Sequence, residues 1–159
     1  MKQVALVCAG VVLSLVIGYG QGRSANDPDQ KELYGYVLTM DKVKKLGAAT
    51  HEMQDAAKKH PDLDRGNGGD AKDLKDMVAK LQKYPEVVSI LSRNGLSARE
   101  YAIGFFTLLQ ASMAVGFKKS GTYKEYPPQM LQLVSRQNLD FVDQHFDEIK
   151  KLTYMGDGQ

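Results

Sequence analysis

The stretch that decides the fold is Ser97–Lys119, S-A-R-E-Y-A-I-G-F-F-T-L-L-Q-A-S-M-A-V-G-F-K-K. Ser97 and Glu100 form the S-x-x-E pattern of a capping box, which satisfies two backbone N–H groups at a helix start. The 17 residues Tyr101–Phe117 carry no charge, and apolar side chains cover most of the helix circumference. A helix that is apolar nearly all round is buried, and this one is shorter than the about 20 apolar residues of a membrane span. The stretch therefore predicts a central core helix over about Ala98–Lys119.

Helical patterns also precede this stretch. Thr39 is a suitable N-cap for a helix that ends near His60, and Asp70 is a suitable N-cap for a second helix that ends at Tyr84-Pro85. A short helix follows, since proline suits its first position and Asn94-Gly95 suits its end. We expect these helices to pack their apolar stripes against the central helix.

After the central helix, Ser135 is a suitable N-cap for a last helix that closes at Lys150 and Lys151. No run of residues alternates with period two, so no strand is expected. The sequence predicts an all-α domain over residues 39–154, with four main helices plus one short helix around the buried central helix. Residues 155–159 are expected to form a disordered tail.

The first 25 residues differ in composition from the rest of the chain. Lys2 precedes an apolar run over residues 4–17, and small residues follow it up to Ala25. This is the pattern of a secretory signal peptide cleaved between Gly18 and Asn26, and the alternative is an uncleaved membrane anchor. Residues 26–38 then read as a flexible leader and an extended apolar arm that ends at Leu38.

Removal of this segment changes the charge and the cysteine content. The chain has 21 Lys and Arg against 19 Asp and Glu, but Lys2 and Arg23 precede residue 25, so the remainder is balanced at 19 to 19. Nucleic-acid binding needs a clustered basic face, so a neutral domain with interspersed charges argues against it. Cys8 is the only cysteine, so a cleaved chain has no disulfide and no thiol chemistry.

Three polar residues interrupt the apolar central helix: Thr107, Gln110 and Ser112. Buried polar groups need hydrogen-bond partners, which either the protein or a bound ligand supplies. These three residues are therefore candidates to bind a ligand in a pocket beside the helix. Satisfaction within the protein is the commoner arrangement and is the alternative.

His51-Glu52-Met53-Gln54-Asp55 resembles the zincin pattern, with Asp in place of the second histidine. On a helix, His51 and Asp55 would share a face and could ligate one metal ion. The sequence marks no third ligand, and a solvated helix face accounts for the same residues.

Asp62, Asp64 and Asp73 have the first, third and twelfth positions of a calcium-loop spacing. The loop departs from that pattern at its fifth and sixth positions, where Gly66 and Asn67 stand in reversed order, and at its twelfth, which is not Glu. A glycine-rich turn between helices explains the same residues.

His145 with Met113 or Met53 is a candidate pair of haem ligands. No C-x-x-C-H motif is present, and methionines at helical spacing are ordinary core residues. We therefore expect no cofactor.

Two segments, Pro85–Ala114 and Asn138–Ile149, resemble a family of small exported bacterial proteins of uncharacterised function. The likeness lies in helix caps and core positions, so it implies export and helical packing but no activity. Leu38-Thr39-Met40-Asp41-Lys42 is also similar to the motif of the LTxxQ periplasmic chaperone-like group, with Lys in place of Gln.

Three functions remain as hypotheses. The first is a non-enzymatic exported module, periplasmic or secreted, that binds a protein or envelope component through a groove or through the arm Tyr34–Leu38. The second is a carrier of a small molecule or lipid, with a pocket beside the central helix. The third is a metal-binding protein or an enzyme that uses His51, Asp55 or the Asp62–Asp73 loop.

Overall fold

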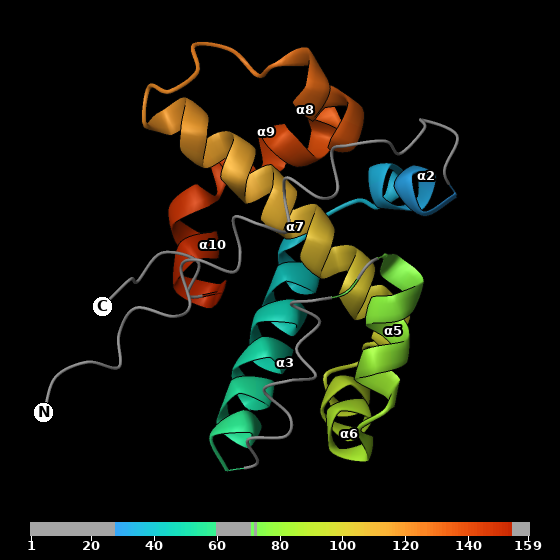
Figure 1. The fold of residues 1–159 in the computed structure, drawn as a ribbon. Helices are drawn as coiled ribbons and strands as arrows, with labels where there is room; N and C mark the ends of the chain where they lie inside the picture. Colours follow the sequence, from blue (N-terminus) through green and yellow to red (C-terminus); the bar gives the residue numbers. More distant parts are fainter. Residues whose placement is uncertain (1–27, 60–70, 72, 154–159) are drawn as a thin grey trace, which may run out of the picture.

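The computed structural model describes residues 28–59, 71 and 73–153, which contain eight helices and no strand (Figure 1). The predicted all-α fold is confirmed. The helices are α2 (Pro28–Gly35), α3 (Met40–Lys59), α5 (Leu74–Gln82), α6 (Pro85–Arg93), α7 (Ala98–Lys119), α8 (Pro128–Leu133), α9 (Arg136–Gln144) and α10 (Phe146–Thr153).

Helix α7 has the predicted bounds and the predicted central position. The Ser97 hydroxyl accepts a hydrogen bond from the Glu100 backbone N–H at 3.1 Å, as the capping pattern requires. Helices α2, α3, α5, α6 and α9 all contact α7, which runs across the molecule between them (Figure 1). Leu108, Ala111 and Val115 are buried from solvent almost completely, so α7 supplies much of the core.

Helix α3 begins at its predicted cap, because the Thr39 hydroxyl accepts a hydrogen bond from the Lys42 backbone N–H at 3.3 Å. It packs against α7, α6 and α10. Gly104 of α7 lets α3 approach closely, because a Cβ there would lie 3.0 Å from both the Leu46 side chain and the Tyr36 hydroxyl.

Helix α5 begins later than its predicted cap. Asp73 is the N-cap, and its carboxylate accepts a hydrogen bond from the Asp76 backbone N–H at 2.7 Å. With this start, Leu74 and Met77 lie in the core. The packing of α5 against α7 therefore favours a helix that begins at Leu74. The predicted cap, Asp70, lies outside the described residues.

Helix α6 follows the prediction. Pro85 is its first residue, and Gly95 just after the Asn94 cap has a φ of 70°, which only glycine adopts without strain.

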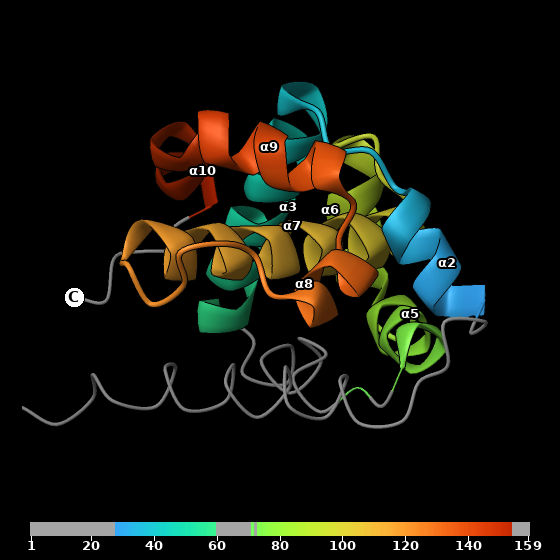
Figure 2. The same ribbon diagram turned by 90° about the horizontal axis from the view of Figure 1, so that it is seen from above.

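The predicted last helix is two helices. The Ser135 cap is confirmed, since its hydroxyl accepts a hydrogen bond from the Asn138 backbone N–H. At His145 the backbone leaves the helical conformation, with φ −111° and ψ 17°, and α10 begins at the next residue. The break lets α9 pack on α7 while α10 packs on α3. Figure 2 shows α9 and α10 along one side of α7.

The predicted flexible leader and extended arm are wrong for residues 28–35, which form α2. Only residues 36–38 are non-helical in the described part of that segment. Pro28 suits a first helical position, Leu33 of α2 is buried, and the Arg99 guanidinium at the start of α7 pairs with Asp29 and Glu32. Contacts with α7 therefore hold the segment as a helix.

No helix within the described ranges is long and apolar enough to cross a membrane. The predicted signal peptide over 1–25 and the predicted tail over 155–159 lie outside those ranges.

Candidate functional site

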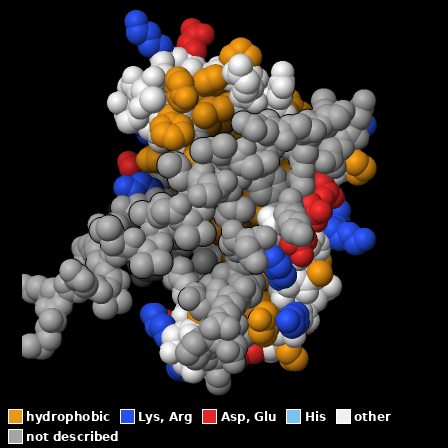
Figure 3. All heavy atoms as spheres, viewed as in Figure 1, with side chains coloured by type: hydrophobic (Ala, Val, Ile, Leu, Met, Phe, Trp, Pro, Cys, Tyr) orange, Lys and Arg blue, Asp and Glu red, His pale blue; other side chains and the backbone are white. Residues whose placement is uncertain are grey.

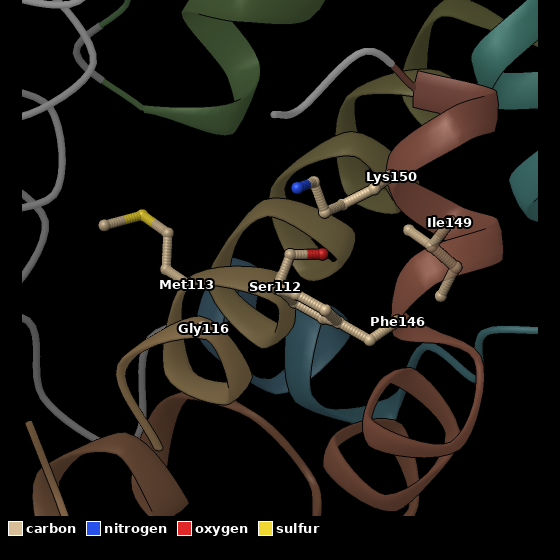
Figure 4. A pocket seen from close by; sticks show the side chains of 6 residues that line it. All are labelled: Ser112, Met113, Gly116, Phe146, Ile149 and Lys150. Carbon is tan, nitrogen blue, oxygen red and sulfur yellow. The ribbon is translucent and has the colours of Figure 1, made fainter. Parts of the chain in front are cut away.

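A pocket of about 190 Å³ lies between α7 and α10, and we call it the α7–α10 pocket (Figure 4). Its lining residues are Ser112, Met113 and Gly116 of α7 and Phe146, Ile149 and Lys150 of α10. In Figure 4 the Ser112 hydroxyl and the Lys150 ammonium both face the space between the two helices, and the Phe146 ring lies beneath Ser112.

Helical spacing explains how the two walls form. Ser112 and Gly116 are four residues apart on α7, and Phe146 and Lys150 are four residues apart on α10, so each pair shares a face. A Cβ at Gly116 would lie 3.8 Å from the end of the Phe146 ring, which is an ordinary van der Waals distance. The pocket is thus the space that two small residues of α7 leave opposite larger residues of α10.

The Ser112 hydroxyl is buried and has no hydrogen-bond partner among the described residues. Serine and threonine inside helices often bond to the carbonyl four residues earlier. Thr50 bonds to the Leu46 carbonyl and Thr153 to the Ile149 carbonyl in this way, each at 2.8 Å. Ser112 does not, so its hydroxyl remains available at the pocket wall.

Lys150 is half-buried and pairs with no carboxylate in the part of the chain that the structure describes. Lys118 and Lys119, by contrast, both form ion pairs with Asp143, at 3.2 and 3.0 Å. These contacts lower the pKa of the Asp143 carboxyl, chiefly through the hydrogen bond from Lys119. The Lys150 ammonium thus has unused donors beside the pocket.

The structure does not bring the three predicted ligand residues together. Thr107 is satisfied within the protein, because its hydroxyl donates to the Leu33 carbonyl at 3.3 Å. The Gln110 carbonyl oxygen is buried without a described partner, but Gln110 does not line the pocket. Residues that are two positions apart on an α-helix are separated by a rotation of about 200°. Gln110 and Ser112 therefore face nearly opposite sides of α7. Only Ser112 belongs to the site.

The predicted zinc pattern on α3 has other partners. Asp55 pairs with Lys58 at 2.9 Å, and the hydrogen bond from Lys58 is the main cause that lowers the pKa of this carboxyl. Glu52 binds Arg93 and Asn94 of the α6 end, at 2.7 and 2.9 Å. These bonds already engage Asp55 and Glu52, the two acidic residues of the pattern.

The remaining metal and haem candidates are Asp62, Asp64, Asp73 and His145. Asp73 caps α5, while Asp62 and Asp64 lie outside the described residues. Across the described ranges, no group of three or more His, Cys, Asp or Glu side chains is arranged to hold a metal ion. His145 packs against the Phe141 ring at the α9–α10 break, with the ring centroids 5.0 Å apart.

Sequence reasoning missed the α10 side of the pocket. The sequence pattern predicts Lys150 only as a cation that closes the last helix. In the structure Ile149 is buried, whereas Phe146 is only partly buried, and both line the pocket. The spacing of these residues places them on one face, but only the packing of α10 shows that Ser112 lies opposite.

A second concave surface lies between α2 and α8, and we call it the α2–α8 groove. It has a volume of about 400 Å³ and is lined by Gln30, Lys31, Tyr34, Gly35, Leu131 and Gln132. Tyr34 is 45% exposed and Leu131 is 36% exposed, which is high for large apolar side chains. Figure 3 shows further apolar side chains at the surface over the C-terminal end of α7, next to the segment that leads to α8.

Comparison of the chain with protein-family models, with curated proteins and with solved structures gave no match, so the site stands on its own geometry.

Proposed function

We propose that this protein is a non-enzymatic helical binding protein that holds a small ligand in the α7–α10 pocket. The observation that carries the proposal is the buried Ser112 hydroxyl, which lines the pocket and has no described partner. A buried hydroxyl without a hydrogen bond costs about 1–3 kcal/mol, and a bound ligand that bonds to it recovers this cost. This is the second of the functions inferred from the sequence, now tied to specific residues.

The size of the pocket supports a ligand smaller than a drug molecule. Pockets for drug-sized ligands measure about 300–1,000 Å³, and this one measures about 190 Å³. Its lining combines apolar side chains with two convergent polar groups, which is typical of small-molecule sites.

The test is NMR with ¹³C-labelled methyl groups of Met113 and Ile149, both of which line the pocket. The protein is titrated with a library of small neutral, cationic and anionic compounds, and we expect a subset to shift these two methyl resonances. Gly116→Leu is the matched control, because its side chain extends from the α7 wall into the pocket. If no compound shifts the two methyls, or if Gly116→Leu responds as the wild type does, the pocket is not a ligand site.

The α2–α8 groove supports a second candidate function, docking of a protein or envelope component, which was the first hypothesis from the sequence. Its support is the exposure of Tyr34 and Leu131 on one groove. A photo-crosslinking residue at position 34 should then give a specific adduct in the host, and Leu131→Asp should abolish it. Equal labelling from the exposed Lys44 position would reject this candidate.

We also propose export, with cleavage between Gly18 and Asn26. The support is the sequence pattern of the first 25 residues. N-terminal sequencing of the protein from the envelope or secreted fraction should find a start within that interval. A protein that still begins at Met1 would support the alternative of an uncleaved anchor.

A further inference from the structure

We propose that the ligand of the α7–α10 pocket is a small carboxylate that carries a short apolar group. The Lys150 ammonium and the Ser112 hydroxyl bind the carboxylate, and Phe146 and Ile149 contact the apolar part. This inference rests on the proposed function and names the chemical class of the ligand.

The charge of the pocket selects an anion. Lys150 is the only charged side chain among the six described residues that line the pocket. Its ammonium has three donors and no acceptor, so a cationic ligand is repelled and a neutral ligand gains only ordinary hydrogen bonds. A carboxylate gains charge-assisted hydrogen bonds, which are roughly twice as strong as neutral ones.

In the proposed complex, each of the two polar groups binds one oxygen of the carboxylate. They come from opposite walls, Ser112 from α7 and Lys150 from α10, and Figure 4 shows both facing the same space. A serine hydroxyl donates one hydrogen bond, and no described group accepts it in this structure. A carboxylate accepts from both groups and thereby satisfies the buried hydroxyl.

The rest of the lining selects an apolar substituent. Phe146, Ile149 and Met113 give the pocket more apolar than polar surface. An inorganic anion such as sulfate leaves this surface without contacts, whereas a hydrocarbon group is transferred from water onto it and binds more tightly for that reason. The space left by Gly116 next to the Phe146 ring suits a small ring or a short chain.

The experiment compares benzoate, benzamide and benzylamine, which share a ring and differ in charge, with sulfate as an anion that has no apolar group. Binding is measured from the Met113 and Ile149 methyl shifts. We expect benzoate to bind at least about tenfold more tightly than benzamide, with no saturable shift from benzylamine or sulfate.

Variants then assign the preference to Lys150 and Ser112. Lys150→Met keeps the length of the side chain and should abolish the preference for benzoate over benzamide, while Ser112→Ala should weaken benzoate binding about fivefold or more. Lys151→Met is the matched control, because Lys151 is the exposed neighbour and does not line the pocket. Thermal melts verify that each variant is folded.

The outcomes separate this inference from the proposed function. If benzamide or benzylamine binds as tightly as benzoate, or if Lys150→Met keeps the preference, the carboxylate class is wrong although the pocket still binds a ligand. If none of the four probes shifts the methyls while library compounds do, the class is likewise wrong. If the library also gives no shifts, the proposed function itself fails.

Discussion

The buried side chain of Asn138 connects α9 to the segment between α2 and α3. It is 1% exposed, its side-chain oxygen accepts from the Leu38 backbone N–H at 2.9 Å, and its amide nitrogen donates to the Tyr36 carbonyl at 2.7 Å. The segment between α2 and α3 has no helical hydrogen bonds of its own at these groups. Asn138 replaces them and ties this segment to α9.

Asn138→Ala should therefore lower the free energy of unfolding by about 2–4 kcal/mol, because it leaves a buried N–H and a buried carbonyl without partners. Urea unfolding measures the loss. Gln137→Ala is the matched control at an exposed neighbouring position and should change stability by less than about 0.5 kcal/mol. Equal effects of the two substitutions would show that the Asn138 bonds do not hold the segment.

The pKa of Tyr101 makes the free energy of unfolding depend on pH in the alkaline range. Its ring is 4% exposed, its hydroxyl lies 2.9 Å from the Thr50 hydroxyl, and burial raises its pKa to about 12. The unfolded chain loses this proton near pH 10 and the folded chain keeps it to about pH 12. The folded state thus binds more protons in this interval, so its stability is complete below pH 10 and falls as pH rises towards 12.

The expected fall due to Tyr101 is about 1.4 kcal/mol per pH unit between these values. Tyr101→Phe removes this contribution, so its unfolding free energy should decrease less steeply with pH than that of the wild type. Urea unfolding at several pH values from 9 to 11.5 gives both slopes. Parallel slopes for the wild type and Tyr101→Phe would mean that the Tyr101 hydroxyl ionises as easily in the folded protein as in the unfolded chain.

At the scale of the helices, glycines decide which pairs approach closely. Gly104 of α7 has this role, but Gly116 does not, since a Cβ there meets only the Phe146 ring at 3.8 Å. Among the described glycines, the closest approach is at Gly47 of α3, where a Cβ would lie 2.5 Å from the Leu152 backbone oxygen of α10.

Gly47→Ala and Gly116→Ala should therefore have opposite effects. Alanine stabilises a helix by about 1 kcal/mol relative to glycine, and Gly116→Ala should gain part of this. Gly47→Ala should instead lose about 1–3 kcal/mol, because a backbone atom of α10 has to move away. Thermal or urea melts measure both, and a stabilised Gly47→Ala protein would contradict the close crossing of α3 and α10.

For the molecule as a whole, the sequence predicts that calcium does not stabilise the fold, because Gly66 and Asn67 are wrong for the fifth and sixth positions of a calcium loop. A site with a Kd a hundredfold below the added calcium would contribute about 2.7 kcal/mol, a clear rise in melting temperature. We expect no rise. A rise that disappears in Asp62→Ala with Asp64→Ala would establish a calcium site. The same assay with zinc uses His51→Ala as its control.

The sequence alone determined the features that depend on residues within about four positions of one another. The caps at Thr39, Ser97 and Ser135, the start of α6 at Pro85 and the bounds of α7 follow from local hydrogen bonds, from the fixed φ of proline and from helical periodicity. For this reason they could be read without knowledge of the fold.

Only the tertiary structure decided the features that join distant residues. Arg99 holds α2 as a helix from 67 positions away, and Asn138 reaches Leu38 across 100 positions. The break at His145 exists because α9 and α10 pack on different helices, and it is this break that carries Lys150 to the side of Ser112. Helical spacing defines which residues share a face but not which face lies opposite, so the candidate site followed from packing.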